Sequence, residues 1–257
     1  MIVTMSFNFI LMLFFAAVHP FSKADSATAE QGNQTAAING AWQLVSTGTG
    51  TPTDTITIKL VVDGFFTVAS YDQANKRFYH TYGGTYNISN DNYTEHYEFS
   101  TIDSSKVGQS TTLTHKFDDG KWHLSGSSSK EVWVKIDEAN DKSPLSGAWR
   151  IAGREDQEGN MNMRKPGPRK TVKVLTNNRF QWIAYNTATK QLSGTGGGTY
   201  TTQNGKYAET IEFFSRDSSR VGVTLPFNYE VKESKWHHSG LSSKGNKVNE
   251  VWEKVAK

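Results

Sequence analysis

The sequence contains no cysteine in its 257 residues. Neither a disulfide nor a lipid-modified cysteine can therefore stabilise or anchor the chain, and each folded unit depends on its core alone. Apolar runs are also short. After the N-terminal segment, none approaches the roughly 20 residues that a membrane-spanning helix needs.

The N-terminal segment has the features of an export signal. Residues 10–18 are apolar, and Ser22-Lys23-Ala24 places small residues at the two positions that a signal peptidase reads. No Lys or Arg precedes the apolar run, which leaves a retained anchor as the alternative. We expect residues 1–24 to be a cleaved signal peptide and residues 25–37 to be disordered. The mature protein is then periplasmic or secreted and has no membrane span.

The charge balance gives little indication of a charged partner. Residues 25–257 carry 27 Lys and Arg against 25 Asp and Glu, an excess too small to indicate nucleic-acid binding. The one basic cluster, residues 164–170, contains two prolines and a glycine, and we interpret it as a solvated loop. We expect no nucleic-acid partner and a monomeric protein.

An internal repeat sets the domain organisation. Gly40-Ala41-Trp42 recurs as Gly147-Ala148-Trp149, 107 residues later. After a loop insertion the offset becomes 114, as in Gly83-Gly84-Thr85-Tyr86 and Gly197-Gly198-Thr199-Tyr200, and at the closing Glu-Val-Trp it is 119. The sequence therefore predicts two copies of one domain, residues 38–136 and 146–257, joined by a linker at residues 137–145.

Each copy is predicted to be all-β. Short runs rich in Thr, Val, Tyr and Phe alternate with clusters of Gly, Asn, Asp and Ser, and no segment shows a helical period. Eight such runs per copy, joined by short connections, favour a fold of two tandem eight-stranded up-and-down barrels. A two-sheet sandwich is the alternative.

The ordered motifs resemble those of a known group. A Gly-x-Trp at the start of each copy and a closing Trp-x-Lys are similar to the lipocalins and the wider calycin group. The ordered motifs Gly-Gly-Thr-Tyr, Tyr-x-Glu, Val-Gly, Lys-Trp and Glu-Val-Trp, present in both copies, resemble a lipocalin-like family of exported bacterial proteins with unassigned function. In lipocalins an arginine of the last strand covers that Trp, and the resemblance implies that Lys135 and Lys254 lie over Trp42 and Trp149.

Alternation along the strands indicates which side chains face each interior. In residues 93–99 one face holds Tyr93, Glu95, Tyr97 and Phe99, whereas Glu98 belongs to the face assigned to solvent. A hairpin centred near Ser105 would place Glu95 opposite His115, and its copy would place Glu209 opposite Tyr229. The predicted ligand-binding residues are Phe66, Tyr86, Tyr93, Glu95, Tyr97 and His115 in the first copy and Phe180, Trp182, Tyr200, Glu209 and Tyr229 in the second.

The sequence supports neither a metal site nor nucleophilic catalysis. Three of the histidines, His80, His96 and His115, become Gly194, Thr210 and Tyr229 in the copy, so no ligand set recurs. The serines lie in turn sequences where they act as turn formers. We expect no cofactor, no bound metal and no enzyme activity.

Three functions remain open. The first is binding of a small hydrophobic or aromatic ligand in an apolar cup with few polar groups, and both loop insertions fall at one rim, as expected for a cup with a variable mouth. The second is a filled-barrel scaffold that binds a protein or glycan through exposed groups such as Trp122 and Trp236. The third is an isomerase or hydrolase that uses Glu95 and His115 as an acid–base pair.

Overall fold

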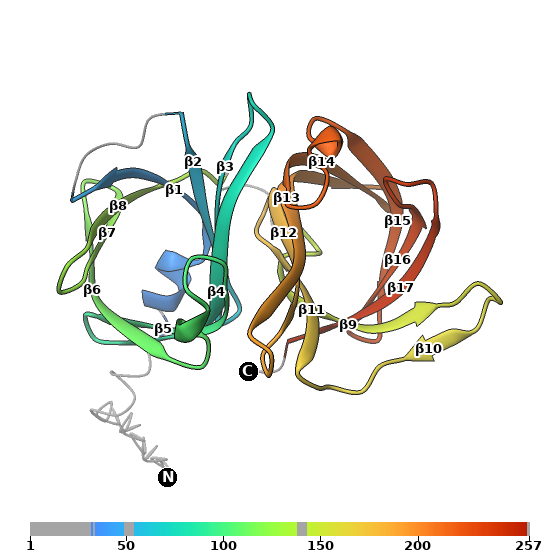
Figure 1. Ribbon diagram of the computed structural model, residues 1–257, viewed down its shortest axis with the longest axis horizontal. Helices are drawn as coiled ribbons and strands as arrows, with labels where there is room; N and C mark the ends of the chain where they lie inside the picture. Colours follow the sequence, from blue (N-terminus) through green and yellow to red (C-terminus); the bar gives the residue numbers. More distant parts are fainter. Residues whose placement is uncertain (1–31, 33, 49–53, 138–142, 256–257) are drawn as a thin grey trace, which may run out of the picture.

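The protein forms two closed antiparallel barrels that lie side by side (Figure 1). The structure is a computed structural model and describes residues 32, 34–48, 54–137 and 143–255. The first barrel contains β1 (Gly40–Thr47), β2 (Ile56–Val62), β3 (Phe65–Asp72), β4 (Arg77–Ser89), β5 (Asn92–Ser100), β6 (Ser110–Asp118), β7 (Lys121–Ser125) and β8 (Lys130–Lys135). A short 3₁₀ helix, η1 (Ser104–Lys106), lies between β5 and β6.

The second barrel repeats this plan with one added strand. It contains β9 (Gly147–Glu155), β11 (Arg169–Leu175), β12 (Arg179–Asn186), β13 (Gln191–Gln203), β14 (Lys206–Phe214), η2 (Ser218–Arg220), β15 (Thr224–Lys232), β16 (Lys235–Leu241) and β17 (Lys247–Lys254). The added β10 (Met161–Met163) pairs with β9 at the edge of the described sheet. Pairing of β1 with β8 and of β9 with β17 closes each sheet on itself, which confirms the predicted pair of eight-stranded barrels and excludes the sandwich.

The N-terminal part of the chain differs from the prediction where it is described. Residues 34–38 are helical, so the end of the segment predicted to be disordered (25–37) is folded. The reason is a contact with the barrel, because Ile38 is fully buried and its carbonyl accepts a 2.8 Å hydrogen bond from the Trp42 indole. The predicted signal peptide lies outside the described residues. None of the described helices is long and apolar enough to cross a membrane.

The two ends of each barrel differ in their connections. We call the end that holds Trp42 and Trp149 the floor, and the opposite end the mouth. The connections β1–β2, β3–β4, β5–β6 and β7–β8 lie at the mouth, as do their equivalents in the second barrel. Both insertions of the second copy, the β9–β11 connection with β10 and the β16–β17 connection, are therefore at its mouth, as predicted.

A repeated Gly-Gly pair allows a close approach between β4 and β5. The pairing shifts by one residue after Gly83, which leaves Glu98 unpaired as a bulge. A Cβ on Gly84 would lie 2.0 Å from the carbonyl oxygen of His96, and a Cβ on Gly198 would lie 2.1 Å from that of Thr210. Only glycine fits at these two positions, which explains why this motif occurs in both copies.

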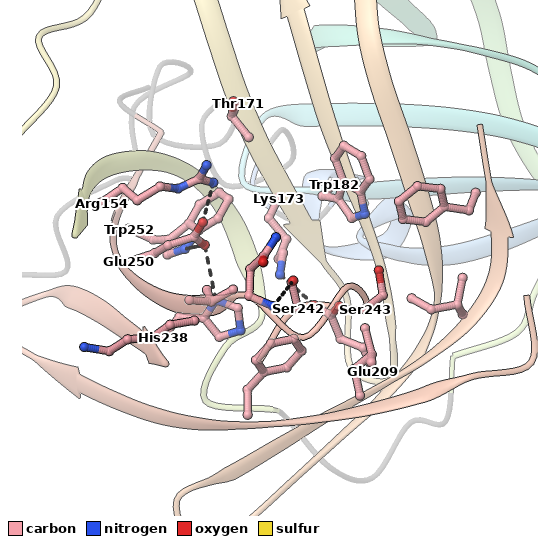
Figure 2. Close-up of a pocket in the computed structure, with 17 residues that line it drawn as sticks. Arg154, Thr171, Lys173, Trp182, Glu209, His238, Ser242, Ser243, Glu250 and Trp252 are labelled. Atoms are coloured by element: carbon pink, nitrogen blue, oxygen red, sulfur yellow. Dashed lines mark hydrogen bonds and ion pairs between the residues drawn. The ribbon is translucent and has the colours of Figure 1, made fainter. Parts of the chain in front are cut away.

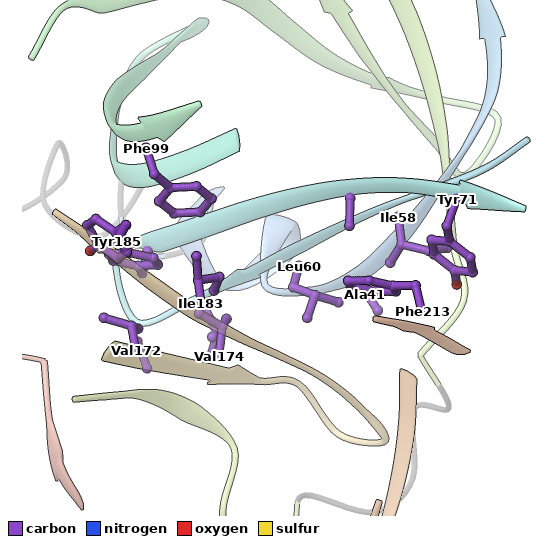
Figure 3. Close-up of a cluster of buried hydrophobic side chains, with 14 residues drawn as sticks. Ala41, Ile58, Leu60, Tyr71, Phe99, Val172, Val174, Ile183, Tyr185 and Phe213 are labelled. Carbon is purple, nitrogen blue, oxygen red and sulfur yellow. The ribbon is translucent and has the colours of Figure 1, made fainter. Parts of the chain in front are cut away.

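The barrels pack against each other through a shared apolar core (Figure 3). It buries side chains from the outer surfaces of both barrels, which explains why β2 and β3 are buried on both faces. The core consists of Ala41, Ile58, Leu60, Val62, Phe65, Ala69, Tyr71 and Phe99 from the first barrel and Ala148, Val172, Val174, Ile183, Tyr185 and Phe213 from the second.

Contacts across this core occur in reciprocal pairs. Tyr71 stacks on Phe213 with ring centroids 4.8 Å apart, and the equivalent Tyr185 packs on Phe99 at 5.0 Å. In the same way, β2 contacts β12 while β3 contacts β11, and β4 contacts β14 while β5 contacts β13. This is the pattern of a two-fold symmetric dimer interface, here built within one chain.

Candidate functional site

Each barrel encloses a buried ion pair. In the first barrel, Lys59 Nζ of β2 lies 2.8 Å from Glu95 Oε1 of β5, and their side chains are 1% and 3% exposed. In the second barrel, Lys173 of β11 and Glu209 of β14 lie 2.6 Å apart and are similarly buried. The two pairs occupy equivalent positions, 114 residues apart.

Aromatic rings surround each buried ammonium group. Four ring centroids lie 5.0 to 5.8 Å from Lys59 Nζ, those of Phe66, Tyr93, Trp122 and Trp133. The equivalent rings around Lys173 Nζ lie at 5.2 to 5.9 Å and belong to Phe180, Tyr207, Trp236 and Trp252. Burying a lone ammonium is unfavourable, and the carboxylate together with the ring faces offsets that penalty.

The two lysines were missed at the level of sequence, although a signal was present. Lys59 and Lys173 each interrupt an apolar run, and they recur at the same offset as the glutamates. A cation on a buried strand, repeated in both copies with an inward-facing acid, indicates an internal ion pair. The prediction instead assigned the glutamates a His or Tyr partner.

The second barrel contains a cavity of about 370 Å³ between the ion pair and the mouth (Figure 2). Its apolar wall includes Trp182, Ile211, Phe214, Leu225, Phe227 and Trp252. Its polar groups are Arg154, Thr171, Lys173, Glu209, His238 and Glu250. The inserted β16–β17 connection and the start of β17 complete the wall with Ser242, Ser243, Asn246, Lys247 and Val248.

Glu250 organises the polar side of this cavity. Its carboxylate pairs with Arg154, lies 3.3 Å from His238 Nδ1, and accepts a 3.1 Å hydrogen bond from the Trp252 indole. Burial alone would raise the pKa of Glu250, but His238, Arg154 and Lys173 outweigh it and lower the pKa to about 2. Burial lowers the pKa of His238, helped by Lys173. At neutral pH the carboxylate is therefore ionised and the imidazole is neutral.

The first barrel has a smaller cavity in the same place. Its volume is about 220 Å³, and Glu95, Tyr97 and Glu131 line it. Tyr82 and Tyr97 project into this region, where the second barrel has Gly196 and Ile211. Tyr97 donates a 3.0 Å hydrogen bond to Glu95 and so occupies the oxygen that Lys59 does not contact.

The predicted ligand-binding residues separate into two levels. Glu95 and Tyr97 line the first cavity, and Trp182 and Glu209 line the second. Six others pack in the filled lower half of the barrels or against it: Phe66, Tyr86, Tyr93, Phe180, Tyr200 and Tyr229. Each barrel is therefore filled near the floor and open near the mouth, so both the filled interior and the cup describe part of it.

The predicted pairing across β5 and β6 is wrong. Glu95 lies opposite Thr111, and Glu209 lies opposite Leu225, rather than opposite His115 and Tyr229. The hairpin closes where Tyr97 and Gln109 meet, so its centre is Asp103 and not Ser105. The cause is η1, a 3₁₀ turn capped by the Asp103 side chain, which makes the connection asymmetric.

His115 consequently lies at the floor end and not beside Glu95. Its backbone N–H donates to the Asp91 carbonyl at 2.8 Å, and its Nε2 lies 3.3 Å from the Asn90 carbonyl. Glu95 belongs to a separate network with Lys59 and Tyr97. The two side chains proposed as an acid–base pair are therefore parts of different hydrogen-bond networks.

The bulge at Glu98 overturns the predicted faces at the end of β5. Beyond it the alternation is displaced, so Phe99 and its equivalent Phe213 enter the core between the barrels and not the interior. Glu98, assigned to solvent, accepts hydrogen bonds from Tyr185 and from Lys170. The equivalent Glu212 accepts them from Tyr71 and Arg179.

At the floor, the predicted lysine-over-indole contacts are confirmed. Lys254 Nζ lies 4.4 Å from the Trp149 ring centroid, and Lys135 Nζ lies 5.3 Å from that of Trp42. Trp122 and Trp236 are fully buried, so neither offers an exposed surface. In the part of the chain that the structure describes, no group of three or more His, Asp or Glu side chains could hold a metal ion.

Comparisons with known proteins agree with the duplication. A family model described as "Domain of unknown function (DUF4488)" matches residues 37–143 and again residues 144–257. No curated protein matches the chain. A solved structure, that of the uncharacterised protein YLR301w from Saccharomyces cerevisiae, is similar over 84% of this chain and 97% of its own, with 13% identity and a TM-score of 0.40. The two family matches show a tandem repeat of a domain of unassigned function and give no support to membership of the lipocalins.

Proposed function

The chain belongs to the family described as domain of unknown function DUF4488, of which it carries two copies, and from this premise we propose that it is a small-molecule binding protein. The second barrel holds the ligand in its open upper half. The ligand is small and mainly apolar or aromatic and carries at least one polar group. In this proposal the barrel interior holds a ligand as the lipocalin cup does, and the protein binds that ligand without catalysing a reaction.

One observation carries the proposal, the 370 Å³ cavity above the Lys173–Glu209 pair. Its volume falls in the range of small-molecule sites, which are mostly apolar with a few fixed polar groups. The rings of Trp182, Phe214 and Phe227 provide flat apolar walls. The Lys173–Glu209 pair at the base of the cavity is already satisfied, so it does not demand a charged ligand.

The first barrel serves mainly as a structural partner in this proposal. Its cavity is smaller, and Tyr82 and Tyr97 occupy the region where the second barrel is open. The insertions that extend the mouth belong to the second copy alone. We therefore expect one ligand per chain.

Native mass spectrometry of the chain purified from its own source tests the proposal. A co-purifying small molecule in a one-to-one ratio is expected, whereas a ligand-free mass under the mildest conditions would contradict it. Ile211→Tyr, which introduces the residue of the first barrel at the equivalent position, should abolish the adduct by filling the cavity. Thr201→Tyr adds the same side chain at an exposed position of β13 and should leave the adduct intact.

The two other functions have less to support them. A filled scaffold that binds through exposed aromatic residues is disfavoured by the burial of Trp122 and Trp236. An isomerase or hydrolase that uses Glu95 and His115 is disfavoured because these residues belong to different hydrogen-bond networks. Export to the periplasm or beyond remains part of the proposal and depends on residues 1–24. Mass analysis of the mature N-terminus in the source organism tests it.

A further inference from the structure

The second cavity contains a histidine with one unused nitrogen. His238 of β16 is 3% exposed and lines the cavity wall between Phe227 and Glu250. Its Nδ1 contacts the Glu250 carboxylate at 3.3 Å (Figure 2). Its Nε2 is buried and has no hydrogen-bond partner among the described residues. A buried polar atom without a partner is unfavourable, and such an atom in a residue that lines a cavity indicates a group that a ligand completes.

The chemistry of the neighbours fixes what Nε2 can do. An ionised carboxylate only accepts hydrogen bonds, so the proton of the imidazole must be on Nδ1, facing Glu250. A neutral ring carries a single proton, which leaves Nε2 with a free lone pair. The unused nitrogen is therefore an acceptor and calls for a donor.

On the basis of the proposed binding function, we infer that the ligand of the second barrel carries a hydroxyl or N–H group that donates to Nε2 of His238. The rest of the ligand packs against Trp182, Phe214 and Phe227, so it is a hydroxylated or amino-substituted aromatic or alicyclic molecule and not a plain hydrocarbon. His238 is thus the residue that determines specificity in this site.

The first barrel provides a natural comparison. Leu124 occupies the position equivalent to His238, and it is buried in the apolar core of that barrel. Glu131, the equivalent of Glu250, keeps its bond from the Trp133 indole at 2.9 Å. The carboxylate and indole are thus common to both barrels, whereas the imidazole acceptor belongs to the second alone.

Calorimetric titration with three related probes tests the inference. The probes are 2-naphthol, naphthalene and 2-methoxynaphthalene, of which only the first can donate a hydrogen bond. Both other probes are more hydrophobic than 2-naphthol, so the hydrophobic effect alone would not favour 2-naphthol. We expect the intact chain to bind 2-naphthol about tenfold more tightly than either other probe, the effect of one hydrogen bond.

Variants at position 238 identify the acceptor. His238→Leu copies the first barrel and should make the three affinities equal, whereas His238→Gln retains an acceptor oxygen and should keep most of the preference. His237→Leu, at the exposed neighbouring position, should behave as the unchanged chain. Thermal unfolding of each variant establishes that it is folded, and His238→Gln keeps the test valid if His238→Leu does not fold.

The outcomes separate the inference from the proposed function. Equal binding of all three probes by the intact chain, or a preference for 2-naphthol that persists in His238→Leu, would overturn the inference and leave the pocket in place. Failure of all three probes to bind would overturn the inference together with the apolar pocket on which it rests.

Discussion

The hydroxyl of Tyr71 in the first barrel donates a 2.5 Å hydrogen bond to Glu212 in the second. The equivalent Tyr185 donates to Glu98 in the opposite direction. Burial, together with the facing carboxylate, raises the pKa of both tyrosines, so both phenols stay protonated and act as donors. Two equivalent tyrosine–glutamate hydrogen bonds therefore connect the two barrels around their shared apolar core.

Removal of these hydroxyls should weaken the attachment of the barrels. Tyr71→Phe keeps the stacking on Phe213 but leaves a buried Glu212 oxygen with Arg179 alone, so we expect a loss of about 1–3 kcal/mol in the free energy of unfolding. Tyr185→Phe should cost a similar amount. Urea denaturation measures both, and Tyr79→Phe, whose side chain is exposed, is the control. A loss no larger than that of the control would mean that these bonds contribute little.

The buried ion pairs should respond differently to single and double substitution. Lys59→Met leaves Glu95 as an unpaired charge inside the first barrel, and we expect a loss of about 3–5 kcal/mol. Lys59→Met combined with Glu95→Leu removes both charges and should recover much of that loss, because the surrounding rings accept apolar groups.

Urea denaturation of the single and double variants checks this, with the exposed Lys130→Met as the control. A double variant whose loss equals or exceeds the sum of the two single losses would contradict this prediction, because it would show no favourable coupling between Lys59 and Glu95.

Much of the architecture could be predicted because it depends on local patterns. Alternation, turn residues and the repeat predict two eight-stranded barrels. The resemblance of the Gly-x-Trp and Trp-x-Lys motifs to those of lipocalins implies Lys254 over Trp149. The location of both insertions at one end follows from the strand order alone. These features need no knowledge of how strands are registered against one another.

The details of the site depend on register, which the sequence specifies less directly. A 3₁₀ turn at Ser104–Lys106 moves the centre of one hairpin by two residues, and this separates Glu95 from His115. A bulge at Glu98 turns Phe99 from the interior to the interface between barrels. The sequence did not predict the role of Lys59 because lysine is seldom buried. Its partner Glu95 lies on a strand far away in the sequence, and only the folded barrel brings the two together.

The glycine that permits the bulge should tolerate no side chain. In Gly84→Ala the added methyl group would lie 2.0 Å from a backbone carbonyl oxygen, which cannot move without breaking the pairing of β4 with β5. We expect a loss of at least about 3 kcal/mol, and the same for Gly198→Ala. Gly167→Ala, where a Cβ meets no atom within 4 Å, should change stability little. Thermal or urea unfolding compares the three, and an equal effect in all would contradict the close approach.

Acid should destabilise the second barrel through Glu250. The carboxyl has a pKa of about 2 in the folded state against an ordinary value of 4.5, because His238, Arg154 and Lys173 outweigh its burial. Between these two pH values the unfolded chain binds more protons than the folded one. The stabilisation is therefore complete above about pH 4.5 and is lost as the pH falls toward 2, by about 3 kcal/mol in total.

Glu250→Gln should be less stable near neutral pH and should show a flatter decline through this window, whereas the exposed Glu230→Gln should follow the unchanged chain. Urea unfolding at a series of pH values from about 6 to about 2 measures the slopes. Parallel slopes for Glu250→Gln and the unchanged chain would contradict the depressed pKa.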